Sequence, residues 1–482
     1  MKKLLLTALL LATLGVSHAQ PALELAKVVR QVQASEGMQH ATLSVSLYDV
    51  ASGERLYGYD DQRSVTPASV QKLLTTGTAF ARLGGAFRFT TRLLMRGEVD
   101  REGVLHGDLY IIGGGDPLLG SYRYRQTTPD TLFSQWTAAL RSRGVQRIDG
   151  RIYYVNTLFA GPQQHDSWQH GDVGNYYGAG ATGLNFHENM YFVHFNAGQA
   201  LGDTAKEMRT VPKNLSLQTL NMVTTGPKGS GDQVIAYGLP WFNERVYCGT
   251  VPLGARDFSV RIALPYPART CADLFATYLR SHGVSVTYGA EEAFAEPDSV
   301  RTVSEYRSPV YRQIAQYTNH TSNNIYAEAL FKYLGYKQYK LGTFDNGTRA
   351  VEDYLKERGL ETGGVRVVDG SGLSRLNSVT TDFLGRYLVA VSHEIYFGDF
   401  LESLSAVGSS GTTRNLLPTL PNGMSVRLKT GSMDGVKSYA GYITLANGQR
   451  LAFAIIVNGY ECSGREAGER MASILQKITV LY

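Results

Sequence analysis

Ser69 and Lys72 are the two side chains of this sequence best suited to nucleophilic chemistry. They stand three residues apart in the run Thr-Pro-Ala-Ser-Val-Gln-Lys over residues 66–72, which contains the only Ser-x-x-Lys of the chain. On a helix this spacing places both side chains on one face. A hydroxyl beside an amine at the positive end of a helix can serve as nucleophile and base. For the pair taken alone, an ordinary surface helix is the better explanation, so its meaning depends on the rest of the chain.

A helix is the element that has to position this pair. Thr66 is a good N-cap, because its side-chain oxygen can accept a hydrogen bond from a free backbone N–H. Pro67 suits the first helical turn, where its missing N–H has no partner to lose. We therefore predict a helix that begins at Thr66, runs to Leu83 and ends at Gly84-Gly85.

Two later runs carry residue types that complement this pair. Residues 322–324, Ser-Asn-Asn, stand just before a predicted helix over 325–334. Residues 429–432, Lys-Thr-Gly-Ser, end a predicted strand over 424–430. Each run alone is weak evidence, but all three motifs in this order, on a helix, a loop–helix junction and a strand, are specific. The set resembles the signature of class A β-lactamases and penicillin-binding proteins.

The residue types fit acyl transfer from a D-Ala-D-Ala amide or a β-lactam. Ser69 is the candidate nucleophile. Lys72 is the candidate base, provided that burial and a like charge such as Lys429 favour its neutral amine. Ser322 can relay a proton between the nucleophile and the leaving amine.

Four further residues and one backbone group are candidates for binding the substrate. Asn324 can hold the substrate's amide, and Lys429 offers a fixed positive charge for the terminal carboxylate, with the Thr430 hydroxyl beside it. Gly431 lets the substrate lie against the strand edge. The backbone N–H of Ser432, together with that of the nucleophile, is a candidate for the oxyanion hole.

Both ends of the chain are predicted to contribute to an antiparallel sheet covered by helices, which makes the fold class α+β. Alternating apolar residues predict a strand over 41–50, with a hairpin partner over 55–59. Near the C-terminus, Asn447-Gly448 is a strong turn signal between two predicted strands. Residues 87–303 are richer in strands and turns. Further helices are predicted over 23–35, 129–143, 347–358, 381–393 and 464–477.

The composition is that of an exported globular protein. The 482 residues are 43% hydrophobic and 18% charged. Residues 1–19 resemble a secretory signal, with two lysines, an apolar stretch and small residues at the cleavage positions. Because no later run reaches membrane length, we expect no transmembrane segment in the mature chain. Loss of the two lysines lowers the net charge from +5 to +3, which is too mild to indicate nucleic-acid binding.

Neither a metal nor an organic cofactor is indicated. Cys248, Cys271 and Cys462 match no zinc spacing, and either one bridge between the first two or three free thiols fits the sequence. His187-Glu188 and His194 have the wrong spacing for a zinc-protease motif and lie in a predicted strand.

Over nearly the whole mature chain, the sequence resembles the low-molecular-mass class C penicillin-binding proteins, the D-alanyl-D-alanine carboxypeptidase/endopeptidase family. Besides the three motifs, the resemblance rests on the runs 107–117, 176–179 and 369–374. Ser69 and Ser322 are 253 residues apart, far more than in a simple β-lactamase. The family's middle motif is usually Ser-Asp-Asn, whereas this chain has Ser-Asn-Asn; no chemical role is assigned to the middle residue.

This resemblance implies a split catalytic domain of the β-lactamase/transpeptidase-like type, interrupted by two inserted strand-rich domains. We expect the catalytic domain over 22–86 plus 304–482, one inserted domain over 87–162 plus 251–303, and a second over 163–250. The implied partners are peptidoglycan stem peptides and β-lactam antibiotics. The implied location is the periplasm, with an extracellular or membrane-peripheral location as the alternative.

Two other functions fit the same motifs. A β-lactamase or esterase of the same fold would differ in its deacylation rate, which the motifs do not encode, although the long insertion disfavours it. A sensor that binds cell-wall peptides with little turnover would share the acylation site. Whether carboxypeptidase or endopeptidase action dominates is left open by the sequence.

Overall fold

A six-stranded antiparallel sheet forms the centre of the first of two units into which the chain divides. The structure is a computed structural model that describes residues 20–408, 411–417 and 419–482, so the predicted signal over 1–19 lies outside the described residues. The strand order is β18-β19-β20-β21-β1-β2. The strands are β1 (Thr42–Asp49), β2 (Arg55–Tyr59), β18 (Ser405–Ala406), β19 (Ser425–Met433), β20 (Val436–Thr444) and β21 (Arg450–Asn458).

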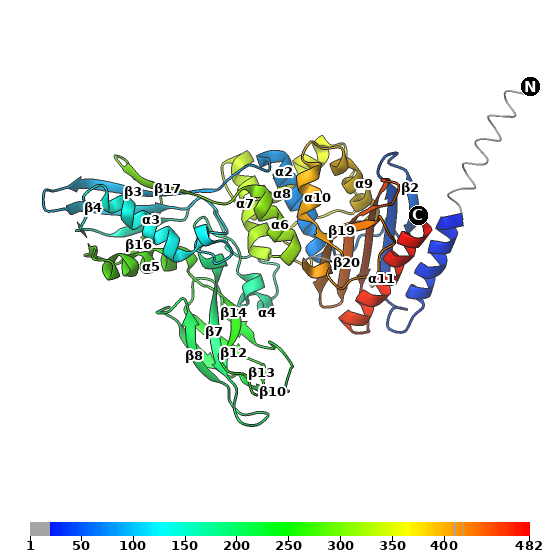
Figure 1. Ribbon diagram of the computed structural model, residues 1–482, viewed down its shortest axis with the longest axis horizontal. Helices are drawn as coiled ribbons and strands as arrows, with labels where there is room; N and C mark the ends of the chain where they lie inside the picture. Colours follow the sequence, from blue (N-terminus) through cyan, green and yellow to red (C-terminus); the bar gives the residue numbers. More distant parts are fainter. Residues whose placement is uncertain (1–19, 409–410, 418) are drawn as a thin grey trace, which may run out of the picture. The chain divides into compact units, whose positions relative to one another are not determined.

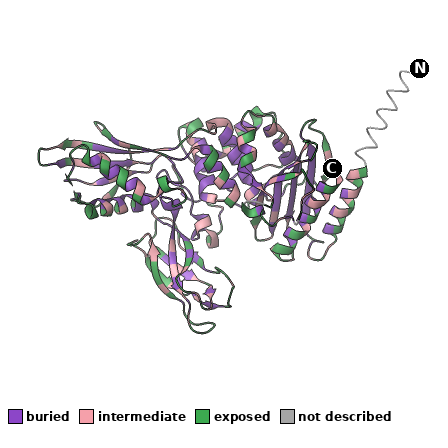
Figure 2. Ribbon diagram, viewed as in Figure 1, coloured by how far each residue is buried: buried purple, intermediate pink, exposed green. Residues whose placement is uncertain are grey.

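Helices cover both faces of this sheet (Figure 1). Successive side chains of β21 point to opposite faces of the sheet, and both faces carry apolar residues that need cover. Leu451, Phe453 and Ile455 pack on one face with the helix over 20–33 and with α11 (Gly464–Leu481). The intervening residues face α9 (Thr381–Ser392), which contacts β1, β20 and β21. The central strands are accordingly buried (Figure 2). The remaining helices of this unit are α2 (Lys72–Leu83), α6 (Tyr311–Thr321), α10 (Phe397–Ser403) and the greater part of α8 (Phe344–Glu357).

The second unit is built on a seven-stranded mixed sheet. Two helices, α3 (Pro129–Arg141) and α5 (Pro267–Ser281), bury a shared core that includes Trp136 and Phe275 against it. The seven strands are β3 (Thr90–Val99), β4 (Val104–Ile112), β5 (Arg147–Ile148), β6 (Ile152–Val155), β15 (Ser285–Val286), β16 (Ala290–Ala293) and β17 (Arg301–Arg307).

Smaller sheets follow within the same unit and enclose a core of their own, which contains Tyr191 and Tyr247. Their strands are β7 (Met190–Asn196), β8 (Lys206–Val211), β9 (Gln218–Asn221), β10 (Thr224–Gly226), β11 (Ile235–Tyr237), β12 (Glu244–Cys248), β13 (Thr250–Pro252) and β14 (Phe258–Ala263). The helices α4 (His170–Val173) and α7 (Asn324–Tyr339) belong to this unit as well. The predicted α+β class, with an antiparallel sheet flanked by helices and strand-rich insertions, is confirmed.

The two units differ from the predicted domains in two places: the first unit resumes at Tyr311 and not at residue 304, and a later segment moves to the second unit. The first unit contains Tyr311–Asn323 and everything from Thr348 onward, whereas Asn324–Gly347 groups with the second unit. The reason is visible at Lys332 of α7, whose amine donates to the carbonyl of Pro162, 2.7 Å away. The further division of the insertion at residues 163 and 250 stays a prediction.

Two local findings bear on export and on cysteine chemistry. Within the described part of the chain, no helix combines the length and apolarity needed to cross a bilayer. Cys248, Cys271 and Cys462 are all free thiols. Cys271 is fully buried in the core beneath α5, which raises the pKa of its thiol.

Candidate active site

Ser69 lies in a short 3-10 turn, Ala68–Gln71, that leads directly into α2. The predicted Thr66 cap is wrong: no side chain caps this turn. Instead, the Thr66 backbone N–H donates to the side-chain oxygen of Asn458 at 2.8 Å, and the Asn458 amide donates back to the Thr66 carbonyl at 3.1 Å. Because Ala68 takes a left-handed conformation (φ 48°), the α-helix cannot extend back to Thr66. The predicted end at Gly84 is confirmed.

Lys72 is fully buried and directs its amine at the Ser69 hydroxyl. Its Nζ atom donates to Ser69 Oγ at 3.0 Å and to the backbone carbonyl of Ser371 at 2.7 Å. The predicted proximity of Ser69 and Lys72 is therefore present. A second acceptor from a distant loop fixes the direction of the lysine side chain.

The loop that supplies this acceptor had no assigned role in the sequence analysis. Asp369 holds it together: its carboxylate accepts from the backbone N–H groups of Gly372 at 2.8 Å and Ser374 at 2.6 Å. Gly372 is left-handed (φ 81°), and a Cβ there would come within 2.0 Å of the Ala68 carbonyl oxygen. In the sequence, the run 369–374 supported only the family resemblance, and its contact with the Ser69 turn was not predictable from spacing.

Ser322 and Lys429 form the second pair of the site. Ser322 follows the last residue of α6 in a left-handed conformation (φ 56°). The amine of Lys429, on β19, donates to Ser322 Oγ at 2.9 Å. Lys429 is fully buried, and this burial, with the charge of Lys72 as a smaller cause, lowers its pKa well below the ordinary value. The environment thus opposes the fixed positive charge predicted for this lysine.

The rest of the third motif lies on β19 beside the nucleophile. A Cβ on Gly431 would come within 2.8 Å of the Ser69 backbone nitrogen and 2.9 Å of the Pro67 carbonyl oxygen. A side chain at position 431 would therefore clash within the protein itself. This steric requirement is separate from the predicted need for a substrate to lie against the strand edge. Thr430 Oγ1 lies 2.7 Å from Thr412 Oγ1, and Ser432 is exposed.

Asn324 is the one predicted site residue outside this arrangement. It begins α7 and belongs to the second unit, whereas Ser322 and the other predicted site residues belong to the first. Its side-chain amide donates to the carbonyl of Tyr177 at 2.8 Å. The structure therefore places Ser69, both lysines, Ser322 and the strand motif within one unit.

The site thus holds one buried lysine beside the Ser69 hydroxyl and a second beside the Ser322 hydroxyl. A family comparison covers nearly the whole chain. The D-Ala-D-Ala carboxypeptidase 3 (S13) family profile matches residues 25–479. The chain belongs to this family. It is a family of serine peptidases.

Relatives of the S13 family resemble the chain over most of its length. A D-alanyl-D-alanine carboxypeptidase of Actinomadura sp. (strain R39) is 28% identical over 91% of this chain and 81% of its own. The D-alanyl-D-alanine carboxypeptidase DacB of Haemophilus influenzae is 25% identical over 88% of this chain and 87% of its own. The crystal structure of penicillin-binding protein 4 from Haemophilus influenzae shares the fold, with a TM-score of 0.77, 23% identity, and coverage of 93% and 99% of the two chains.

Proposed function

We propose that this protein is a serine D-Ala-D-Ala carboxypeptidase, endopeptidase or both, which cleaves peptidoglycan stem peptides through an acyl-enzyme on Ser69. The observation that carries the proposal is the 3.0 Å hydrogen bond from the fully buried amine of Lys72 to the Ser69 hydroxyl. Membership of the S13 family supports the choice of substrate.

Acylation follows from this geometry. Ser69 Oγ attacks the carbonyl carbon of the scissile amide, and the hydroxyl proton passes to a neutral Lys72 amine. The backbone N–H groups of Ser69 and Ser432 are the proposed donors to the oxyanion that forms. As the tetrahedral intermediate collapses, the leaving amine takes a proton and an ester on Ser69 remains.

Ser322 is the proposed proton relay to the leaving amine. Its hydroxyl accepts a hydrogen bond from Lys429, so its own proton is free to be donated. Water then attacks the ester with the same groups acting in reverse, which releases the shortened peptide and restores the Ser69 hydroxyl.

Lys429 and Thr430 are the proposed partners of the substrate's terminal carboxylate. A buried lysine of lowered pKa gains a proton most readily when an anion arrives beside it, so we propose that carboxylate binding and protonation of Lys429 are coupled. Asn324 is the proposed partner of the substrate's amide. Its side-chain amide donates to the Tyr177 carbonyl, and this hydrogen bond fixes the orientation of the side chain.

We propose that the chain is exported to the periplasm by a signal over residues 1–19, and that β-lactams acylate Ser69 as substrate mimics. An extracellular or membrane-peripheral location is the alternative. Export would bring the enzyme to peptidoglycan. The proposed chemistry uses no cofactor.

Two measurements test the function. Intact-mass analysis and peptide mapping after treatment with a reporter penicillin should place one label on Ser69, absent in Ser69→Ala and retained in Ser473→Ala, a matched exposed serine on α11. Purified muropeptides should lose D-Ala or be split at their cross-links, as seen by mass spectrometry. A label on Ser322 would overturn the assignment of the nucleophile. Stoichiometric labelling without product release would favour a sensor, and rapid loss of the label a β-lactamase.

A further inference from the structure

The second unit contains a pocket of about 310 Å³ that is walled by aromatic side chains and lies within that unit alone. Trp168, Trp241 and Phe242 line it, while His165, Asp166 and His170 supply polar groups. Pockets that bind small polar molecules combine an apolar wall with a few such polar groups. No step of the proposed hydrolysis uses this pocket.

The loop between β11 and β12 exposes its apolar side chains to an unusual extent. Trp241 is 54% exposed and Phe242 is 56% exposed. Trp241 also adopts a left-handed conformation (φ 66°), which is strained for a bulky residue. Large aromatic side chains held in solvent on a strained backbone indicate a surface that is completed by a ligand.

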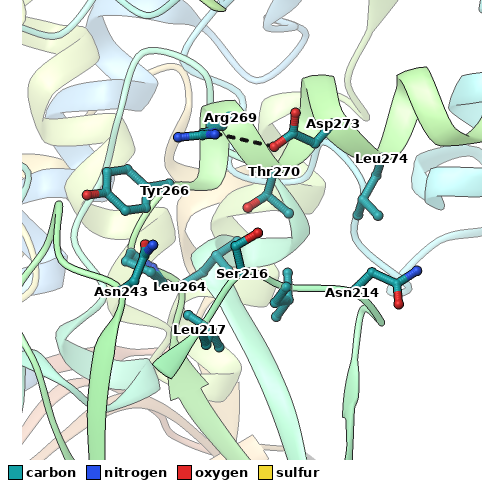
Figure 3. A pocket seen from close by; sticks show the side chains of 12 residues that line it. Asn214, Ser216, Leu217, Asn243, Leu264, Tyr266, Arg269, Thr270, Asp273 and Leu274 are labelled. Atoms are coloured by element: carbon teal, nitrogen blue, oxygen red, sulfur yellow. Dashed lines mark ion pairs between the residues drawn. The ribbon is translucent and has the colours of Figure 1, made fainter. Parts of the chain in front are cut away.

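Buried polar groups fix this loop in place. Arg245, only 2% exposed, donates through Nη1 to the carbonyls of Phe242 at 2.8 Å and Glu244 at 2.7 Å. The hydroxyl of Tyr266, whose ring lines a separate pocket of the same unit (Figure 3), donates to the carbonyl of Trp241. The two exposed aromatic side chains therefore stand on a backbone that is ordered before any ligand arrives, which lowers the entropic cost of binding.

Two other rings of the lining are held by contacts with Phe344. Trp168 is 6% exposed, and its ring packs against Phe344 with centroids 6.1 Å apart at 77°. His165 meets the same phenylalanine edge-on at 4.9 Å. Because Phe344 fixes both rings, the pocket keeps its shape without a ligand.

The charge of the lining selects the class of ligand. Its described residues include the carboxylate of Asp166 and no lysine or arginine. Such a lining repels phosphate and carboxylate groups, which argues against an anionic membrane surface or an acidic peptide. A neutral ligand with apolar faces and several hydroxyl groups fits both the aromatic walls and the polar side chains.

We propose that this pocket binds the neutral N-acetylated sugar units of glycan strands. The C–H face of a pyranose ring stacks on the exposed Trp241 ring, whose π-face carries negative charge. Asp166 accepts from sugar hydroxyls, and the imidazoles of His165 and His170 can donate or accept. Naming the polymer as peptidoglycan rests on the proposed function, because the stem peptides are attached to these strands. The site would hold the enzyme on the polymer whose peptides it cleaves.

The chain's three tryptophans make the test direct. Trp136 is fully buried in the core, so a ligand-induced change in fluorescence reports on Trp168 and Trp241. Full-length Ser69→Ala protein is titrated with a chitin tetrasaccharide, as the probe of N-acetylated sugar, by fluorescence and calorimetry. We expect saturable binding that Trp241→Ala and, separately, Phe242→Ala weaken by about tenfold or more. Phe294→Ala removes an aromatic side chain that is 79% exposed and lies outside the pocket, and it should bind like the parent.

Three outcomes would overturn the proposal: no binding at millimolar sugar, equal binding by the parent and both pocket variants, or binding only to phosphatidylcholine vesicles. The last result would identify the exposed aromatic side chains as a membrane contact. Thermal unfolding of each variant establishes that it is folded. Because Ser69→Ala protein binds sugar without hydrolysing peptide, failure here leaves the proposed hydrolase function standing. Conversely, absence of D-Ala release would count against that function and not against the pocket.

Discussion

The buried amine of Lys429 lies 2.9 Å from the hydroxyl of Ser322, which precedes it by 107 positions in the sequence. The same lysine experiences the charge of Lys72, which itself donates to Ser69. Two lysines and two serines thus form alternating amine–hydroxyl pairs in which a charge on one amine disfavours a charge on the other. Because of this coupling, the number of protons held by the two lysines depends on what is bound at the site.

Lys429→Ala should discriminate between substrates that end in a free carboxylate and those that end in an amide. A charge-assisted hydrogen bond contributes about 1.5–3 kcal/mol, so kcat/KM for a peptide ending in free D-Ala should fall roughly ten- to a hundredfold. The same peptide with an amidated end should be affected much less. The quantity to measure is the ratio of the two kcat/KM values in folded wild-type and variant enzyme. An unchanged ratio would show that Lys429 does not bind the carboxylate.

Carboxylate binding should be accompanied by proton uptake. Because burial lowers the pKa of Lys429, its amine loses charge as the pH rises through that lowered value, and an incoming carboxylate restores the charge. Affinity of Ser69→Ala for a free-acid peptide should therefore fall as the pH is raised through the lowered pKa of Lys429. Calorimetry in buffers of different ionisation enthalpy measures the protons taken up. Lys429→Met should abolish both the uptake and the pH dependence; persistence of either would assign them to another group.

Gly431→Ala should impair acylation through the position of the nucleophile. The added methyl would lie 2.8 Å from the Ser69 nitrogen and 2.2 Å from Ser438 Oγ, so the Ser69 turn has to shift. Overpacking of this kind costs about 1–3 kcal/mol, and we expect the second-order rate of penicillin acylation to drop about tenfold or more. Gly398→Ala is the matched control, since nothing lies within 4 Å of its added methyl. Equal acylation rates in the two variants would contradict the steric role of Gly431.

Lys332 should make stability depend on pH. Burial lowers its pKa to about 7, whereas in the unfolded chain it titrates near 10.5. Between these values the unfolded state binds more protons, so the free energy of unfolding rises with pH, by at most about 1.4 kcal/mol per pH unit. Below about pH 7 the contribution is constant. Denaturant unfolding at several pH values should show a flatter dependence in Lys332→Met than in wild type.

The control for Lys332 is Lys337→Met, which removes an exposed lysine from the same helix. It should follow the wild-type pH dependence. If Lys332→Met also follows it, the Lys332 amine is not the group responsible.

Local sequence by itself determined much of the fold. The alternation of apolar residues specified β1, because a strand exposes opposite faces to successive side chains. Asn447-Gly448 specified the β20–β21 hairpin, and Gly84 the end of α2. The order of the three motifs, together with their residue types, was sufficient to name Ser69, Lys72, Ser322 and the strand run from Lys429 as candidates for the site.

Tertiary structure alone decided how those residues are held and charged. The Thr66 cap failed because Asn458, on β21, binds the Thr66 backbone, an interaction that local propensity does not contain. The Ser371 carbonyl reaches Lys72 across 299 residues. The lowered pKa of Lys429 follows from burial and from the charge of Lys72. Both depend on the tertiary structure, because the energy of a charge is set by the groups around it and not by its neighbours in sequence.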